Sequence, residues 1–241
     1  MAGPKSEGGV TGWAAGPLLA FDTETTGLDV DKERIVTAYL GDGGEGERSW
    51  LVDPGIPIPA EATAVHGITT QEARAHGRPA ADAVAEIVES LAAALGAGAS
   101  VVTYNASYDF TLLDRECRRH GVRLLESRIG RPVGPIVDPL VLDRHVDRYR
   151  PGKRTLADAC RVYQVQLRAA HDARSDALGA LGVARALAAR YPELASLTSA
   201  SVHQLQIGAA LDQAASFAAY LRRQGAVPRD VDGSWPLRPT S

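Results

Sequence analysis

Five residues in separate segments of this sequence have the chemistry of a divalent metal site. Asp22 and Glu24 end an apolar run, and Asp109, His171 and Asp176 follow later in the chain. Because side chains alternate along a strand, we expect Asp22 and Glu24 to share one face at its end. Two adjacent carboxylates repel each other unless a cation joins them, and hard ions such as Mg²⁺ or Mn²⁺ prefer oxygen ligands. The set therefore predicts metal-dependent hydrolysis of a phosphodiester.

The motifs around these residues are Asp-Thr-Glu-Thr-Thr-Gly from Asp22, Asn-Ala-Ser-Tyr-Asp from Asn105 to Asp109, and His-Asp-Ala-Arg-Ser-Asp from His171 to Asp176. In this order and spacing the chain resembles the DEDDh (DnaQ-like) 3′→5′ exonucleases, the family of the proofreading epsilon subunit of bacterial DNA polymerase III. One short motif alone would be weak support, whereas three in order are specific. The resemblance covers residues 17–190. It departs at Tyr108, where the family usually has Phe, a change that keeps the ring.

The resemblance implies a role for each of these side chains. Asp22 is expected to bridge two divalent ions, Mg²⁺ or Mn²⁺. Glu24 and Asp176 are expected to complete the shell of one ion, and Asp109 to hold the other largely through water. His171 is then the general base, and the unperturbed pKa of imidazole, near 6.5, suits that role at neutral pH.

The spacing of the last motif predicts its local structure. Five helical residues turn about 500°, so His171 and Asp176 would not share a face of one regular helix. We therefore expect His171 to precede the helix, Asp172 to cap its N-terminus, and Asp176 to lie in its first turns.

Four further residues are predicted to bind substrate. His66 belongs to Val-His-Gly-Ile-Thr, which matches a family word whose loop contacts the terminal nucleotide, although composition alone indicates only a turn before a capped helix. Thr23 and Thr25 offer hydroxyl and backbone donors near the 3′ end. Asn105 either hydrogen-bonds the loop or the substrate, or only shapes the turn.

Periodicity predicts an α/β fold. Strands are expected at residues 18–22, 35–40, 49–52, 100–104 and 135–137, and helices at 79–95 and 107–120. Asp138-Pro139 has the pattern of an N-cap followed by Pro at the first helical position. The result is a mixed five-stranded sheet flanked by helices, and the resemblance sharpens this to a ribonuclease H-like fold.

We divide the chain into four parts. Residues 1–16 are expected to be a disordered leader without a secretory signal, 17–190 an exonuclease domain, 191–225 a helical extension, and 226–241 a flexible tail. The apolar stripe of residues 201–224 favours packing on the domain itself over binding a partner protein.

Charge and cysteine usage narrow the functional classes. The net charge of −3 argues against nonspecific coating of nucleic acid. Residues 118–154 nevertheless hold ten Lys and Arg against four acidic residues, so this stretch either steers a polyanion or is an ordinary solvated face. Cys117 and Cys160 lack metal-site or redox spacing, which fits a reducing cytoplasm. No apolar run approaches the ~18 residues of a membrane span.

The predicted function is a metal-dependent exonuclease that releases nucleoside 5′-monophosphates from single-stranded or frayed DNA 3′ ends, in proofreading or repair. Trimming of RNA 3′ ends is the alternative, since the motif residues do not separate the two. A nucleic-acid end-binding or assembly module is a further alternative. The expected partners are a single-stranded DNA or RNA 3′ end and a DNA polymerase or repair protein.

Overall fold

The computed structural model describes residues 12–168, 170–228 and 231–240. Its strands are β1 (Leu18–Thr25), β2 (Ile35–Gly41), β3 (Arg48–Asp53), β4 (Arg78–Pro79), β5 (Ser100–Val102) and β6 (Ile136–Val137). Its longer helices are α3 (Ala80–Gly96), α4 (Ala106–His120), α6 (Pro139–Val146), α8 (Ala173–Arg190) and α10 (Ser199–Arg223). Shorter ones are η1 (Gly12–Ala15), α1 (Ala60–His66), α2 (Thr70–His76), α5 (Leu125–Ile129), α7 (Leu156–Val162) and α9 (Pro192–Ala195).

The strands form one mixed sheet in the order β4-β3-β2-β1-β5-β6. The first three strands are an antiparallel meander, and β5 and β6 continue the sheet parallel to β1. The predicted α/β architecture is confirmed, with one strand more than predicted. The additional strand is β4, which pairs with β3 through Arg78 and Pro79 alone. Two residues are too few to produce an alternating sequence pattern.

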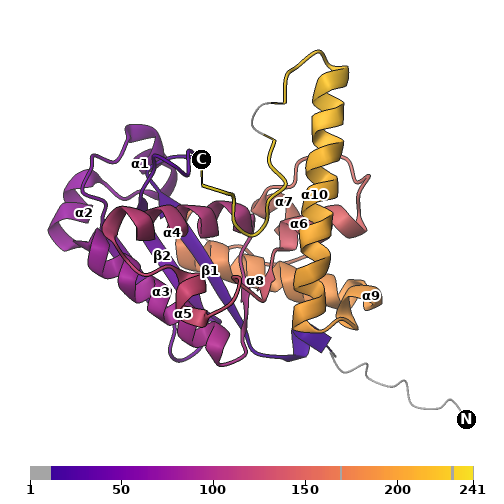
Figure 1. Cartoon of the computed structure of the whole chain (residues 1–241), viewed down its shortest axis with the longest axis horizontal. Coiled ribbons are helices and arrows are strands. Elements are labelled where there is room, and N and C mark those ends of the chain that lie inside the picture. The colour runs from indigo at the N-terminus through magenta and orange to yellow at the C-terminus, as the bar shows by residue number, and fades with distance from the viewer. Residues whose placement is uncertain (1–11, 169, 229–230, 241) are drawn as a thin grey trace, which may run out of the picture.

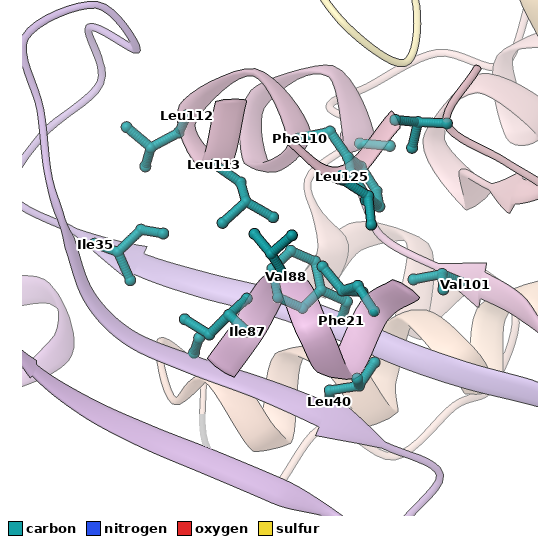
Figure 2. Packing of buried hydrophobic residues seen from close by; sticks show 14 of the residues in the cluster. Phe21, Ile35, Leu40, Ile87, Val88, Val101, Phe110, Leu112, Leu113 and Leu125 are labelled. Carbon is teal, nitrogen blue, oxygen red and sulfur yellow. The ribbon is translucent and has the colours of Figure 1, made fainter. Parts of the chain in front are cut away.

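Strand β1 divides the core between the two faces of the sheet. Phe21 packs with α3 and α4 on one face, in a cluster with Val88 and Leu113 (Figure 2). Leu18 and Ala20 point to the other face, where η1, α7 and α8 supply the cluster. This alternation is the period-two pattern of a strand that is buried on both sides.

The predicted helix caps are present. Asp138 precedes Pro139 and accepts hydrogen bonds from the backbone N–H groups of Leu140 and Val141. Thr69 caps α2 by accepting from the Glu72 N–H at 3.1 Å. Local side-chain to backbone bonding, which the sequence reveals, therefore sets where these helices begin.

Helix α10 is buried only over its first half. Val202, Gln206 and Ala209 are its buried residues, whereas Leu211, Phe217 and Tyr220 are about half exposed. The second half projects beyond the rest of the molecule (Figure 1). The stripe predicted to pack on the domain thus does so in part.

Both ends of the described chain pack on the domain. Trp13 is 1 % exposed, and its indole N–H donates to the Leu194 carbonyl at 2.9 Å. Trp235 is 7 % exposed and donates from its indole N–H to Asp138 at 3.2 Å. The predicted leader falls mainly on residues 1–11, which lie outside the described residues. Residues 226–241 are predicted from sequence to be flexible, and Trp235 within this range is buried.

Two further observations concern the whole described chain. Cys117 and Cys160 are both buried and free. Across residues 12–168, 170–228 and 231–240, no helix has the length and apolar character needed to cross a bilayer.

Candidate active site

Strand β1 directs neighbouring residues to different helices. Asp22 and Glu24 lie on the face of the sheet where Leu18 and Ala20 pack with α8. Thr23 points the other way, towards α4. The alternation predicted from sequence therefore places two carboxylates on the α8 side and a hydroxyl on the α4 side.

Helix α8 brings the third carboxylate to this face. Asp172 caps the helix by accepting from the Ser175 N–H at 2.9 Å, so Asp176 lies in the first turn. One carboxylate oxygen from each of Asp22, Glu24 and Asp176 lies within 4.8 Å of the other two. The capping role of Asp172 and the position of Asp176 agree with the spacing argument from sequence.

Helix α4 supplies Asp109 from the opposite side. Oδ1 of Asp109 accepts hydrogen bonds from the Thr23 N–H at 3.1 Å and the Thr23 hydroxyl at 2.6 Å. Asp109 is only 4 % exposed. Two donors from one β1 residue fix the carboxylate beside the strand, because each bond restricts its rotation. The hydroxyl of Thr23, predicted to contact substrate, is thereby engaged in positioning Asp109.

The pKa values of all four carboxylates are raised above their usual range. Burial, and then repulsion from Asp176 and Asp109, raises the pKa of Glu24 to about 7. Burial raises the pKa of Asp109 to about 7, against the hydrogen bonds from Thr23, which lower it. The pKa values of Asp22 and Asp176 are raised first by burial, and Asp22 also feels the charges of the other three. Concentrated, partly desolvated negative charge of this kind is typical of functional sites.

The donor set fits divalent cations. Oδ1 of Asp176 is buried and has no hydrogen-bond partner. Among the described parts of the chain, no Lys or Arg forms an ion pair with Asp22, Glu24, Asp109 or Asp176. Clustered carboxylate oxygens without a cationic partner match the preference of hard ions such as Mg²⁺ and Mn²⁺.

His171 lies at the entrance of α8. It is exposed, precedes the helix as predicted, and has a positive φ of 65°. Its backbone N–H donates to Asp176 Oδ2 at 3.1 Å, which ties the residue to the carboxylate cluster. A positive φ in a residue other than Gly is uncommon, and such strain is concentrated at functional sites.

The other residues predicted to bind substrate are His66, Thr25 and Asn105. His66 ends α1, its Nδ1 accepts from the Ile68 N–H at 3.1 Å, and it is close enough to His171 for that residue to lower its pKa, after the larger effect of burial. The Thr25 hydroxyl bonds the Gly27 carbonyl at 2.7 Å. Asn105 is exposed at the start of α4.

The sequence predicts only a helix cap at Asp138, and the structure shows further contacts. Its carboxylate also accepts from the backbone N–H groups of Asn105 at 3.0 Å and Ala106 at 2.8 Å. Asp138 thus fixes the start of the helix that carries Asp109. The Asp-Pro pattern signalled the cap on α6, but no local pattern signals a contact with a helix about thirty residues earlier.

Comparison with known proteins identifies a family. A family model described as Exonuclease (RNase_T) matches residues 19–184. An uncharacterized exonuclease, CP81, of Escherichia phage 186 is 36 % identical over 110 residues, which are 46 % of this chain and 54 % of that protein. A DNA polymerase III subunit epsilon-like protein of Rhodobacter capsulatus is 35 % identical over 148 residues, 56 % of this chain and 19 % of that one. The chain thus spans about half or less of the length of these curated relatives.

Solved structures show the same fold. E. coli exonuclease I in complex with a dA16 oligonucleotide superposes with a TM-score of 0.63 at 20 % identity, over 74 % of this chain and 42 % of that one. Exonuclease I from Methylocaldum szegediense gives 0.60 at 23 % identity, over 74 % and 41 %. These likenesses confirm the predicted ribonuclease H-like architecture. Since the family model matches more than half of the chain, this protein belongs to the exonuclease family of DnaQ-like type.

Proposed function

We propose that this chain is a metal-dependent 3′→5′ exonuclease that releases nucleoside 5′-monophosphates from single-stranded or frayed DNA 3′ ends. The observation that carries the proposal is the cluster of Asp22, Glu24 and Asp176 oxygens within 4.8 Å of one another. The 3′→5′ polarity follows from the resemblance to DEDDh exonucleases. The preference for DNA is supported by the similarity to an epsilon-like protein.

The carboxylates have distinct parts in this proposal. Asp22, Glu24 and Asp176 would hold one divalent ion, with Asp22 shared and Asp109 holding a second largely through water. When bound, such ions activate a water and neutralise charge on the attacking and leaving oxygens. Thr23 keeps Asp109 oriented through its two hydrogen bonds.

His171 is the proposed general base. Its exposure leaves the imidazole accessible to substrate and water, while its backbone N–H holds it to Asp176. The imidazole accepts the proton of the attacking water, a transfer that typically contributes about 10²–10⁴-fold to the rate. His66, near His171, is proposed to contact the terminal nucleotide together with Thr25 and Asn105.

The domain limits and the partners belong to the same proposal. Residues 17–190 would form the catalytic domain and 191–225 a helical extension. A DNA polymerase or repair protein is the proposed protein partner, supported by the epsilon-like relative. A cytoplasmic location rests on the use of two cysteines, which are free and buried.

The test follows a 5′-labelled single-stranded DNA oligonucleotide and its RNA analogue with purified protein and Mg²⁺ or Mn²⁺. A metal-dependent ladder that shortens from the 3′ end is expected, and Asp22→Ala should abolish it. The oligonucleotide that is cleaved faster identifies whether DNA or RNA is the preferred substrate. Cleavage that persists in Asp22→Ala, or no cleavage by folded, metal-loaded protein, would refute the assignment and favour an end-binding role.

A further inference from the structure

A cavity of about 730 Å³ lies between the start of α4, α6, α10 and residues 231–235. This volume falls within the roughly 300–1,000 Å³ of pockets that hold small ligands. Asn105 and Ser107 line its α4 wall, and Asp109 lies two residues beyond Ser107 on the same helix. The start of α4 therefore connects the wall of the cavity to the helix that carries Asp109.

The α6 wall of the cavity is basic. Most arginines of the basic stretch 118–154 are engaged elsewhere; Arg150 and Arg154, for example, pair with the buried Asp143. Arg144 and Arg148 line the cavity, and in the part of the chain that the structure describes neither has a carboxylate partner. Arg148 donates to the Ser216 hydroxyl at 3.0 Å, which directs it across to α10. Two cations in this position are available to phosphate groups.

Among the described residues, the acidic side chains that line the cavity do not pair with Arg144 or Arg148 on its α6 wall. Asp138 is buried and its oxygens accept from backbone N–H groups and from Trp235. Asp232 accepts from the Ser234 N–H at 2.9 Å, and Asp212 is on the α10 side. Phosphates are therefore expected along α6, away from Asp212 and Asp232.

The α10 wall offers an aromatic surface. Phe217 lines the cavity and is 53 % exposed. Its ring lies nearly parallel to that of Tyr220, with an interplanar angle of 15° and centroids 6.4 Å apart. Exposed aromatic faces beside a basic wall stack successive bases without sequence preference. Phe217 and Tyr220 are both about half exposed, so their rings are accessible to a ligand.

We propose that this cavity binds the single strand upstream of the scissile phosphodiester, with Arg144 and Arg148 on phosphates and Phe217 on a base. The inference rests on the proposed exonuclease function and extends it from the terminal nucleotide to the strand behind it. The recognised chemistry is a single-stranded polyphosphodiester, which DNA and RNA share.

The test compares substrates that do and do not reach the cavity. The p-nitrophenyl ester of thymidine 5′-monophosphate reports on the metal site and the terminal nucleotide, whereas twelve-nucleotide dT and rU strands also carry the upstream nucleotides that the cavity would bind. In Arg144→Ala/Arg148→Ala we expect KM for the strands to rise by about tenfold, with the slope of log affinity against log salt reduced by about one to two. Hydrolysis of the ester should stay within about twofold of the wild type. Phe217→Ala should also raise KM for the strands, with the salt slope unchanged.

Arg185→Ala/Arg190→Ala is the matched control, because both arginines are exposed on α8 and outside the cavity lining. It removes the same charge and should leave KM for the strands unchanged. An equal rise in KM in the control, or an equal loss on ester and strands in Arg144→Ala/Arg148→Ala, would overturn the proposal.

Binding measurements separate this proposal from the exonuclease assignment. Fluorescence anisotropy of labelled dT and rU strands in EDTA needs no cleavage. Weaker binding by Arg144→Ala/Arg148→Ala alone would support the cavity even if the wild type cleaved nothing, in which case only the exonuclease assignment fails. Unchanged binding would overturn the proposal that the cavity binds nucleic acid and would favour a protein ligand there.

Discussion

Asp22, Thr23 and Glu24 show how three consecutive residues reach partners on two different helices. Asp22 and Glu24 face α8 and meet Asp176, while Thr23 faces α4 and holds Asp109. The strand period alone produces this division. Two of the three clustered carboxylates and the hydroxyl that orients Asp109 therefore come from the same short segment.

The raised carboxylate pKa values predict a pH-dependent stability in the absence of metal. Glu24 and Asp109 have pKa values of about 7 in the folded protein, above the ~4 of unfolded carboxyl groups. Between these values the folded state binds more protons, so the free energy of unfolding falls as pH rises from about 4 to about 7. Differential scanning fluorimetry in EDTA should show a lower Tm at pH 8 than at pH 5.

Divalent metal should reverse that loss. Mg²⁺ or Mn²⁺ binds the ionised carboxylates, and a ligand at a hundred times its Kd stabilises by about 2.7 kcal/mol. The rise in Tm on adding Mn²⁺ should therefore be larger at pH 8 than at pH 5. Asp22→Asn serves as the control: it removes one of the clustered carboxylates and should reduce the rise in Tm on adding Mn²⁺. A Tm in EDTA that rises with pH would contradict the argument.

His171→Ala tests the base at the level of one side chain. The substitution removes the imidazole, whereas the metal oxygens and the caps of α8 remain. We expect kcat on the p-nitrophenyl ester to fall by about 10²–10⁴-fold, with Mn²⁺ affinity by isothermal titration calorimetry nearly unchanged. A similar loss of metal affinity would instead indicate that His171 acts by placing Asp176.

At the level of elements, three segments meet at Asp138. This carboxylate caps α6, accepts from the two N–H groups that begin α4, and accepts from the indole of Trp235 in the C-terminal segment. Burial raises its pKa, and the hydrogen bonds lower it. The position of Asp109 thus depends on a residue about thirty positions later in the chain.

Asp138→Ala should destabilise the protein by about 2–4 kcal/mol, because it leaves several buried donors without an acceptor. The free energy of unfolding from urea titration measures this. Thr198→Ala is a suitable comparison, since Thr198 caps α10 on the surface, where its hydroxyl accepts from the Ser201 N–H at 3.1 Å and bonds the Ser201 hydroxyl at 2.8 Å. The Thr198→Ala substitution should lower the free energy of unfolding by about 1 kcal/mol. Equal costs would mean that Asp138 acts only as a cap.

On the scale of the whole molecule, segments from both ends of the described chain complete the core. Trp13 joins the cluster on the α8 side of the sheet, and Trp235 joins the cluster on the α4 side. Trp235 also lies against His203 of α10, with ring centroids 5.0 Å apart. The C-terminal segment therefore links α10 to the helix that carries Asp109.

Trp235→Ala should lower the free energy of unfolding by about 3–5 kcal/mol, the usual cost of truncating a buried aromatic side chain. Phe217→Ala, which alters a half-exposed ring, should change it by no more than about 0.5 kcal/mol. Urea unfolding of both variants gives the comparison. An unchanged stability in Trp235→Ala would favour the flexible tail predicted from sequence.

The sequence by itself determined the local features of this protein. The alternation around Asp22, the Asp172 cap and the position of His171 before α8 depend on residues only a few positions apart. The order and spacing of the motifs also identified the family. Each of these inferences rests on period or on short-range hydrogen bonding, which neighbouring residues reveal directly.

Tertiary structure alone decided the rest. The bond from Thr23 to Asp109 spans 86 residues and that from Trp235 to Asp138 spans 97. Packing also determined which arginines of the basic stretch pair with acids and which, like Arg144, line the cavity. Contacts of this kind depend on which faces of distant elements meet, and no local pattern specifies that, because the elements reach each other only when the shared core is buried.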